Sequence, residues 1–166
     1  MKILMKLVKF IILTLLTIQL SIVRAEAPYS EYRNNRFSFS IPYPTDLLYP
    51  QGESDNADGQ VFLSRDAQIE LRCWGGYSLD KPLEIKYKNS MSLEKNRSKK
   101  TVITYKIKKN DWFVIGGVDN VNEIIFYRKV FLVDDVFKEC VITYPENEEK
   151  KMDKIVSKIF NEIVPR

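Results

Sequence analysis

The chain has 166 residues, no histidine, two cysteines, and 26 basic against 22 acidic residues. The lack of histidine excludes Ser-His-Asp and Cys-His catalysts, histidine-ligated zinc and the usual general base near neutral pH. Residues 1–25 hold four of the basic residues and no acid, so the rest of the chain has no net charge. That balance argues against a nucleic-acid binder, which keeps a basic excess.

The first 25 residues have the layout of a secretory signal peptide. Lysines precede an apolar run over 10–20, and small residues lead to a cleavage point after Ala25. The alternative is a retained membrane anchor, but the run is about half the ~20 residues that a spanning helix needs. No cysteine near the cleavage point can accept a lipid. We therefore predict a signal peptide over 1–25 and a single globular domain over 26–166, periplasmic or extracellular, that meets the membrane only before cleavage.

The first part of the predicted domain is rich in strands. We expect a strand over 36–41, a polar loop over 45–59 that closes in a tight turn, and strands over 60–65 and 67–74. Pro42 and Pro44 should end the first strand, because proline cannot donate to a ladder. Gly75 and Gly76 should end the third.

A helix is expected to begin near Pro82, capped by Ser78 or Asp80. Its inner stripe is thin: Leu83, Tyr87, Met91 and Glu94. A meander of four strands follows, at 101–108, 111–117, 123–132 and 136–144, in which Gly116-Gly117 suggests a bulge or a close approach. The last element is an amphipathic helix over 147–163.

This order of elements defines the expected fold class. Strands come in runs and helices are segregated between and after them, which is typical of an α+β domain rather than of alternating βαβ units. We therefore predict an antiparallel sheet of about six to seven strands with flanking helices, and a C-terminal amphipathic helix packed on the sheet.

Residues 32–44 carry the pattern Y-x-N-x-R-F-x-F-x-I-x-Y-P. This opening resembles that of small exported bacterial proteins of unknown function, as do Asp58–Phe62, Trp112–Val114 and Tyr144-Pro145 more loosely. That group is similar in architecture to the PsbP/DcrB-like superfamily. The resemblance implies an antiparallel sheet flanked by helices and a non-catalytic accessory or binding role. It supplies no catalytic motif.

Three motifs were weighed as candidate catalytic or metal sites. Two S-x-x-K patterns, at 78–81 and 92–95, match the acyl-transferring penicillin-binding enzymes, but their partner motifs are missing. The segment 55–59 resembles a calcium loop, but Arg65 falls where a bidentate glutamate is needed, so an Asp-Gly turn is favoured. A carboxylate pair for glycoside cleavage stays open, because only geometry identifies one. We assign no catalytic, cofactor-binding or metal-binding residue, and we expect no cofactor.

Cys73 and Cys140 both fall on the apolar side of predicted strands. An oxidising compartment favours a disulfide between them, which would contribute about 4 kcal/mol in the chain-entropy model. Two separately buried thiols are the alternative.

The segment 81–109 holds ten Lys and Arg residues but only Glu84 and Glu94, a local charge of +8. Such a run is either a solvated face or an electrostatic docking surface. For the second case we predict Lys95, Arg97, Lys99 and Lys100 as the binding surface. The expected partner is an acidic protein or an anionic envelope polymer, and not a nucleic acid.

Together these features predict an exported, non-enzymatic binding or accessory protein. An inhibitor or immunity protein against a secreted hydrolase is one form of that function. The alternative is a small histidine-free hydrolase that acts on cell-wall or glycan substrates.

Overall fold

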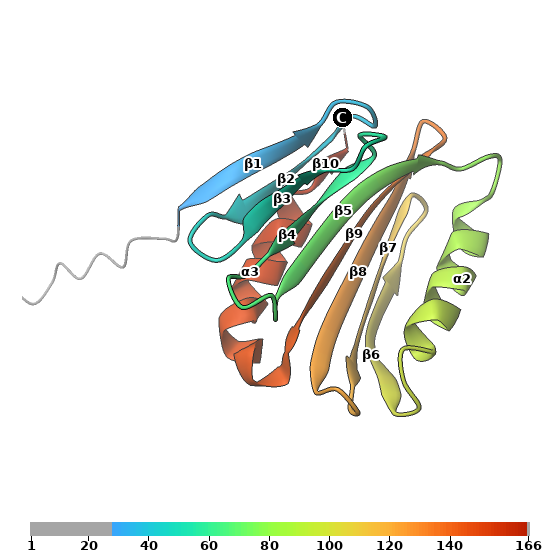
Figure 1. The fold of residues 1–166 in the computed structure, drawn as a ribbon. Helices are drawn as coiled ribbons and strands as arrows, with labels where there is room; N and C mark the ends of the chain where they lie inside the picture. Colours follow the sequence, from blue (N-terminus) through green and yellow to red (C-terminus); the bar gives the residue numbers. More distant parts are fainter. Residues whose placement is uncertain (1–27, 166) are drawn as a thin grey trace, which may run out of the picture.

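The computed structural model describes residues 28–165, and the predicted signal peptide lies outside them. The described residues form two antiparallel sheets and two α-helices (Figure 1). The strands are β1 (Tyr29–Asn34), β2 (Phe39–Pro44), β3 (Tyr49–Glu53), β4 (Gly59–Leu63), β5 (Glu70–Tyr77), β6 (Thr101–Lys108), β7 (Trp112–Asp119), β8 (Ile124–Val133), β9 (Val136–Pro145) and β10 (Val164–Pro165). The helices are α2 (Leu83–Lys95), a 3-10 turn over Glu146–Glu148, and α3 (Glu149–Glu162).

The large sheet has seven strands in the order β3-β4-β5-β9-β8-β7-β6. Strands β6 to β9 form the predicted meander, and β5 pairs with β9 to join it to the earlier strands. A smaller sheet, β1-β2-β10, brings the two ends of the described chain together. This arrangement confirms the predicted α+β class with an antiparallel sheet.

The two helices lie at opposite faces of the large sheet. In Figure 1, α3 passes behind the strands at one end, and α2 lies beside β6 and β7 at the other. The main core lies on the α3 face, where α3 and β2 pack against the sheet. A smaller apolar cluster beneath α2 includes Leu83, Phe113 and Phe126. No helix within residues 28–165 combines the length and the apolar character that a membrane span requires.

Helix α3 packs on the sheet as its periodicity predicts. Met152, Val156, Ile159 and Phe160 are buried along one stripe, and their neighbours on the other side are charged. Each such side chain contributes roughly 1.5–3 kcal/mol when it is fully buried. After α3, β10 pairs with Phe39 and Ser40 of β2. The C-terminal helix therefore connects the two sheets.

Cys73 and Cys140 form a disulfide within the core. They lie directly opposite each other in β5 and β9, with their Cα atoms 4.1 Å apart. The bridge closes a sequence separation of 67 residues, for which the chain-entropy model gives about 4 kcal/mol. It links the meander covalently to the earlier strands, and it excludes two separate thiols.

The predicted first strand is displaced. Phe37 lies in a turn, where its backbone N–H donates to the Asn34 side chain at 2.8 Å, and β2 begins only at Phe39. Pro42 does not end the strand as predicted, because β2 pairs with β1 through Pro44, which is its last residue. Strand β10 pairs with only two residues of β2, so the prolines lie where β2 has no second neighbour.

The expectation that Gly75 and Gly76 end the third strand is also wrong. Strand β5 continues to Tyr77 and pairs with β9 throughout. A Cβ atom added to Gly75 would lie 2.3 Å from the Phe37 side chain. The glycine therefore permits close packing against Phe37 and does not break the strand.

Besides the two-residue β10, two strands lie where no strand was predicted. Strand β1 is polar, and only Tyr32 and Asn34 in it are buried. Strand β3 forms an edge of the large sheet, is mostly exposed, and has an irregular register between Pro50 and Glu53. Neither has an apolar face that periodicity would reveal.

Candidate functional site

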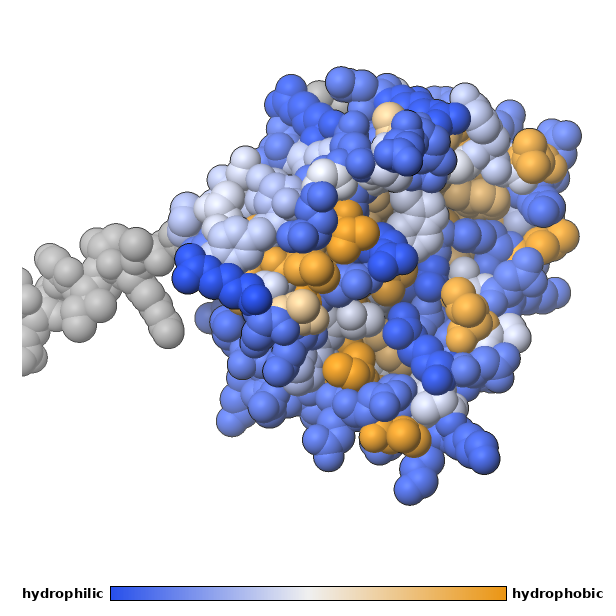
Figure 2. Space-filling view, viewed as in Figure 1, coloured by the Kyte–Doolittle hydropathy of each residue, from blue (hydrophilic) through white to orange (hydrophobic). Residues whose placement is uncertain are grey.

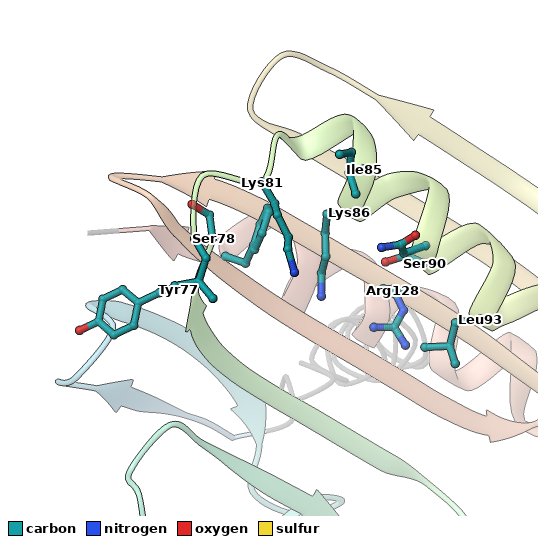
Figure 3. A pocket seen from close by; sticks show the side chains of 11 residues that line it. Tyr77, Ser78, Lys81, Ile85, Lys86, Ser90, Leu93 and Arg128 are labelled. Carbon is teal, nitrogen blue, oxygen red and sulfur yellow. The ribbon is translucent and has the colours of Figure 1, made fainter.

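A cavity of about 450 Å³ lies between α2 and the large sheet. Lys81, from the loop before α2, Lys86 of α2 and Arg128 of β8 line it. Figure 3 shows their three cationic groups pointing into the same space beneath α2. Among residues 28–165, no acidic side chain lines this cavity. We name it the α2 cavity.

The α2 cavity is positioned by charged residues that occupy core-facing positions. Strand alternation places Arg128 on the α2 side of β8, between Phe126 and Val130. Glu139 takes the same side of β9, and Glu94 faces the sheet from the last turn of α2. Because all three are buried where an apolar residue is usual, they must neutralise one another.

Arg128 joins two buried carboxylates. Its Nε donates to Glu94 Oε1 at 2.6 Å, and its Nη1 forms an ion pair with Glu139. Lys86 Nζ lies 2.5 Å from Glu139 Oε2, and Arg97 pairs with Glu94. Three cations thus surround two carboxylates, so the network is positive by one charge. Lys81 adds a second positive charge at the cavity.

Burial sets the electrostatics of this network. Burial and the nearby Arg128 guanidinium lower the pKa of Lys86 to about 8, although the Glu139 carboxylate opposes this shift. Burial also lowers the pKa of Arg128, and Glu94 opposes it. Among the described residues, neither Glu139 oxygen accepts a hydrogen bond of normal geometry. Charge alone therefore holds Glu139, and any anion that enters the cavity meets incompletely solvated cations.

Exposed apolar side chains surround the cationic floor. Seven large apolar side chains are exposed in residues 28–163, and four of them line the α2 cavity: Tyr77 (63% exposed), Leu79 (76%), Ile85 (44%) and Leu93 (59%). In Figure 2, orange apolar patches stand out from the hydrophilic surface on the side where α2 lies. The site therefore combines buried positive charge with an apolar rim.

The predicted binding surface lies beside the α2 cavity and does not line it. Lys95, Lys99 and Lys100 are exposed at the end of α2 and in the following turn. Arg97 instead pairs with Glu94 and lies 4.6 Å from the centre of the Phe126 ring. Of the ten basic residues in the segment 81–109, Lys81 and Lys86 line the cavity.

Sequence reasoning missed Arg128 and Glu139. Charged residues inside two otherwise apolar strands, IIFYRKVFLV and VFKECVITYP, were the sequence feature that could have indicated them. Sequence reasoning also missed two ion pairs of Glu84, whose carboxylate oxygens lie 3.7 Å from Lys88 Nζ and 3.1 Å from Lys108 Nζ. These pairings depend on how α2 sits on the sheet, which no local pattern reports.

The remaining motifs form no catalytic arrangement in the described residues. Ser78 and Lys81 both line the α2 cavity, but Figure 3 shows the Ser78 hydroxyl and the Lys81 amino group pointing in different directions. Ser92 and Lys95 are exposed on α2. Glu94 and Glu139 are the one buried carboxylate pair here, and both are directed at Arg128.

The segment 55–59 is an Asp-Gly turn closed by its own side chains. Ser54 Oγ donates to Asp58 Oδ1 at 2.5 Å, and Asn56 Nδ2 donates to Asp58 Oδ2 at 3.0 Å. The Ser54 hydrogen bond lowers the pKa of Asp58. The carboxylate oxygens are therefore occupied within the turn. Across residues 28–165, no group of three or more Cys, Asp or Glu side chains is arranged to hold a metal ion.

Comparison with known proteins identifies the fold. No family model and no curated protein matches the chain. PsbP of the cyanobacterium Synechocystis sp. PCC 6803 shares the fold with a TM-score of 0.62 at 9% identity, covering 86% of this chain and 95% of that chain. LpqN, involved in cell envelope biogenesis of Mycobacterium tuberculosis, has a TM-score of 0.56 at 10% identity, covering 84% and 86%.

A third solved structure, the Pseudomonas aeruginosa protein of unknown function PA94, has a TM-score of 0.52 at 8% identity and covers 83% of this chain and 97% of that one. At such low identity these likenesses concern the fold alone. The chain therefore has a PsbP-like architecture, as the sequence resemblance implies.

Proposed function

We propose that the protein is exported and acts as a non-enzymatic binding or accessory protein, and that its α2 cavity receives an acidic side chain of a partner protein. The observation that carries this proposal is the set of three cationic groups converging in a cavity with an exposed apolar rim.

Charge and shape favour an acidic protein as the partner. The buried network has one more cation than carboxylate, and Lys81 has no ion pair among the described residues, so a carboxylate completes the balance. Charge-assisted hydrogen bonds to Lys and Arg are roughly twice as strong as neutral ones. Exposed Leu79, Ile85 and Leu93 supply the apolar contact that an anionic polysaccharide would not use. Desolvated charge inside an apolar patch is typical of interface hot spots.

The compartment rests on the predicted signal peptide and on the fold. LpqN, one of the structures with this fold, is described as involved in cell envelope biogenesis. That setting suits an exported accessory protein. An inhibitor or immunity protein against a secreted hydrolase is one form of this function, since it too captures a partner protein.

The buried carboxylates support binding over hydrolysis. A glycosidase presents its two carboxyl groups to the substrate. Here Glu94 and Glu139 contact Arg97, Arg128 and Lys86, and the charged side chains that line the cavity are cationic.

Variant-dependent capture from the periplasm tests the proposal. The full chain with a C-terminal tag is expressed in its native host, and the periplasmic fraction is purified at low salt. We expect an acidic protein to co-purify with the wild type, and its recovery to fall as salt rises, because salt screens the attraction. The cavity variant Lys81→Glu/Leu93→Ser changes two exposed side chains and should reduce recovery at least about tenfold, a loss of ~1.4 kcal/mol.

The matched control is Lys154→Glu/Val121→Ser, which makes the same kinds of change at exposed positions away from the cavity. It should recover the partner as the wild type does. Equal recovery by the cavity variant, recovery of no acidic protein, or absence of the protein from the periplasmic fraction would each contradict the proposal.

A further inference from the structure

A second cavity, of about 300 Å³, lies on the opposite face of the sheet, between strands β6 to β8 and α3. It has an aromatic wall and a polar wall. The aromatic wall consists of Tyr105, Trp112 and Tyr127, one from each strand, and the polar wall consists of Asp153, Ser157 and Asn161 of α3. We name it the α3 groove.

The sequence builds both walls from simple spacing. Residues 153, 157 and 161 are four apart, so they form one line along α3, beside buried Val156 and Phe160. On the sheet, a Cβ atom added to Gly116 would lie 2.5 Å from the Tyr127 ring. Gly116 therefore leaves the space in which the rings of Tyr105 and Tyr127 meet edge to face, with their centroids 6.4 Å apart.

The charges at the α3 groove exclude most ionic ligands. Buried Lys129 donates to the Phe160 carbonyl, and its Nζ lies 5.3 Å from the centre of the Trp112 ring. Lys129 already occupies the cation position over the Trp112 ring, so its amino group would repel a cationic ligand there. An anionic ligand would meet the exposed Asp153 carboxylate, which helps to raise the pKa of Tyr127, after burial. A neutral ligand avoids both repulsions.

We propose that the α3 groove binds a neutral sugar unit of a glycan. The apolar face of a sugar ring packs on the aromatic wall, and its hydroxyl groups bond to Asp153, Ser157 and Asn161. Small-ligand sites combine apolar lining with a few placed polar groups in just this way. An acceptor carboxylate, a hydroxyl and an amide suit hydroxyl groups that both donate and accept. This site is separate from the α2 cavity, so the proposal does not depend on the partner protein.

A proline-rich peptide is the competing ligand, because such peptides dock in aromatic-lined grooves. The α3 groove is one compact cavity with three hydrogen-bonding side chains on a single wall. That arrangement matches a ring with several hydroxyl groups better than it matches a peptide with few free N–H groups.

Titration by NMR of the ¹⁵N-labelled exported protein tests the proposal. The probes are cellotetraose, triacetylchitotriose and maltotriose at millimolar concentration, with decaproline as the peptide probe. We expect at least one sugar to shift the Trp112 indole N–H and the amides of 153–161, and we expect no shift near the α2 cavity. Tyr105→Ala and Asp153→Asn should each weaken binding at least about tenfold, or ~1.4 kcal/mol.

Tyr77→Ala is the matched control, because it removes an exposed aromatic side chain at the α2 cavity. It should leave sugar binding unchanged. The proposal is overturned if no sugar shifts these signals, if decaproline alone does so, or if binding survives both groove substitutions.

Discussion

Arg128 joins a buried carboxylate of α2 to a buried carboxylate of the sheet. Its guanidinium contacts Glu94 of α2 and Glu139 of β9, and it lies 6.0 Å from the centre of the Trp74 ring of β5. Burying such a network rarely increases stability over an apolar core of the same volume. What the network provides is positive charge beneath a cavity.

Lys86 should make stability depend on pH in a defined window. Its pKa in the folded protein is about 8, below the ordinary value of 10.5, so between these values the unfolded chain binds more protons than the folded chain. The contribution of Lys86 to the free energy of unfolding therefore rises as pH increases from 8 towards 10.5. The free energy of unfolding of the wild type, measured with urea, should therefore rise over this window relative to that of Lys86→Met.

Lys88→Met is the control for this experiment, because Lys88 lies on the same helix and its side chain is 72% exposed. Its difference from the wild type should vary with pH much less than that of Lys86→Met, because solvent screens an exposed amino group. A constant difference for Lys86→Met would show that Lys86 is not desolvated as described.

At the scale of elements, α2 is attached to the sheet by charge as much as by apolar packing. Its inner stripe is Leu83, Tyr87, Met91 and Glu94, and the last of these is fully buried. The ion pairs of Glu94 would fix the position of Ile85 and Leu93 on α2 relative to Arg128 on the sheet.

Glu94→Gln should therefore destabilise the protein by about 3 kcal/mol, because it leaves Arg97 without its buried counter-charge and Arg128 with Glu139 alone. Glu84→Gln makes the same change on the exposed side of α2 and should have a much smaller effect. Urea unfolding measures both. Equal losses, or no loss for Glu94→Gln, would show that the buried ion pairs do not fix α2.

Local patterns predicted the elements that have a clear apolar face. The meander, α3 and the common face of Cys73 and Cys140 follow from alternation and from helical spacing. Strands β1 and β3 have no such face, since pairing with neighbouring strands holds them rather than burial of alternate side chains. The alternating pattern predicts that Phe37 lies in a strand. Phe37 lies in a turn instead, because its backbone N–H bonds to Asn34 and its ring packs in the space at Gly75, and alternation reports neither contact.

The candidate site was only partly predictable for the same reason. The basic segment 81–109 indicated positive charge near α2, and Lys81 and Lys86 belong to it. Arg128 and Glu139 come from strands far along the chain, and their role depends on the register of β8 with β9 and on the position of α2. Lys95, Lys99 and Lys100 stay predicted contacts for long-range attraction beside the cavity.

At the scale of the whole molecule, the two faces of the sheet have different chemistry. The α2 face presents cations with an apolar rim, and the α3 face presents aromatic rings opposite polar side chains. Strand β8 contributes to both sites, with Arg128 on the α2 face and Tyr127 on the α3 face, and it pairs with β9, which the disulfide joins to β5. Such a scaffold suits the two proposed roles, a partner protein on the α2 face and a sugar unit on the α3 face.

Hydrogen–deuterium exchange of the protein, alone and with its captured acidic partner, tests the central claim most directly. The account predicts slower exchange at 77–93 and in β8 around Arg128 in the complex, with no change along α3. Protection confined to 97–109 would place the partner on exposed basic residues outside the cavity, and protection along α3 would place it on the other face. Either result would contradict the assignment of the α2 cavity as the binding site.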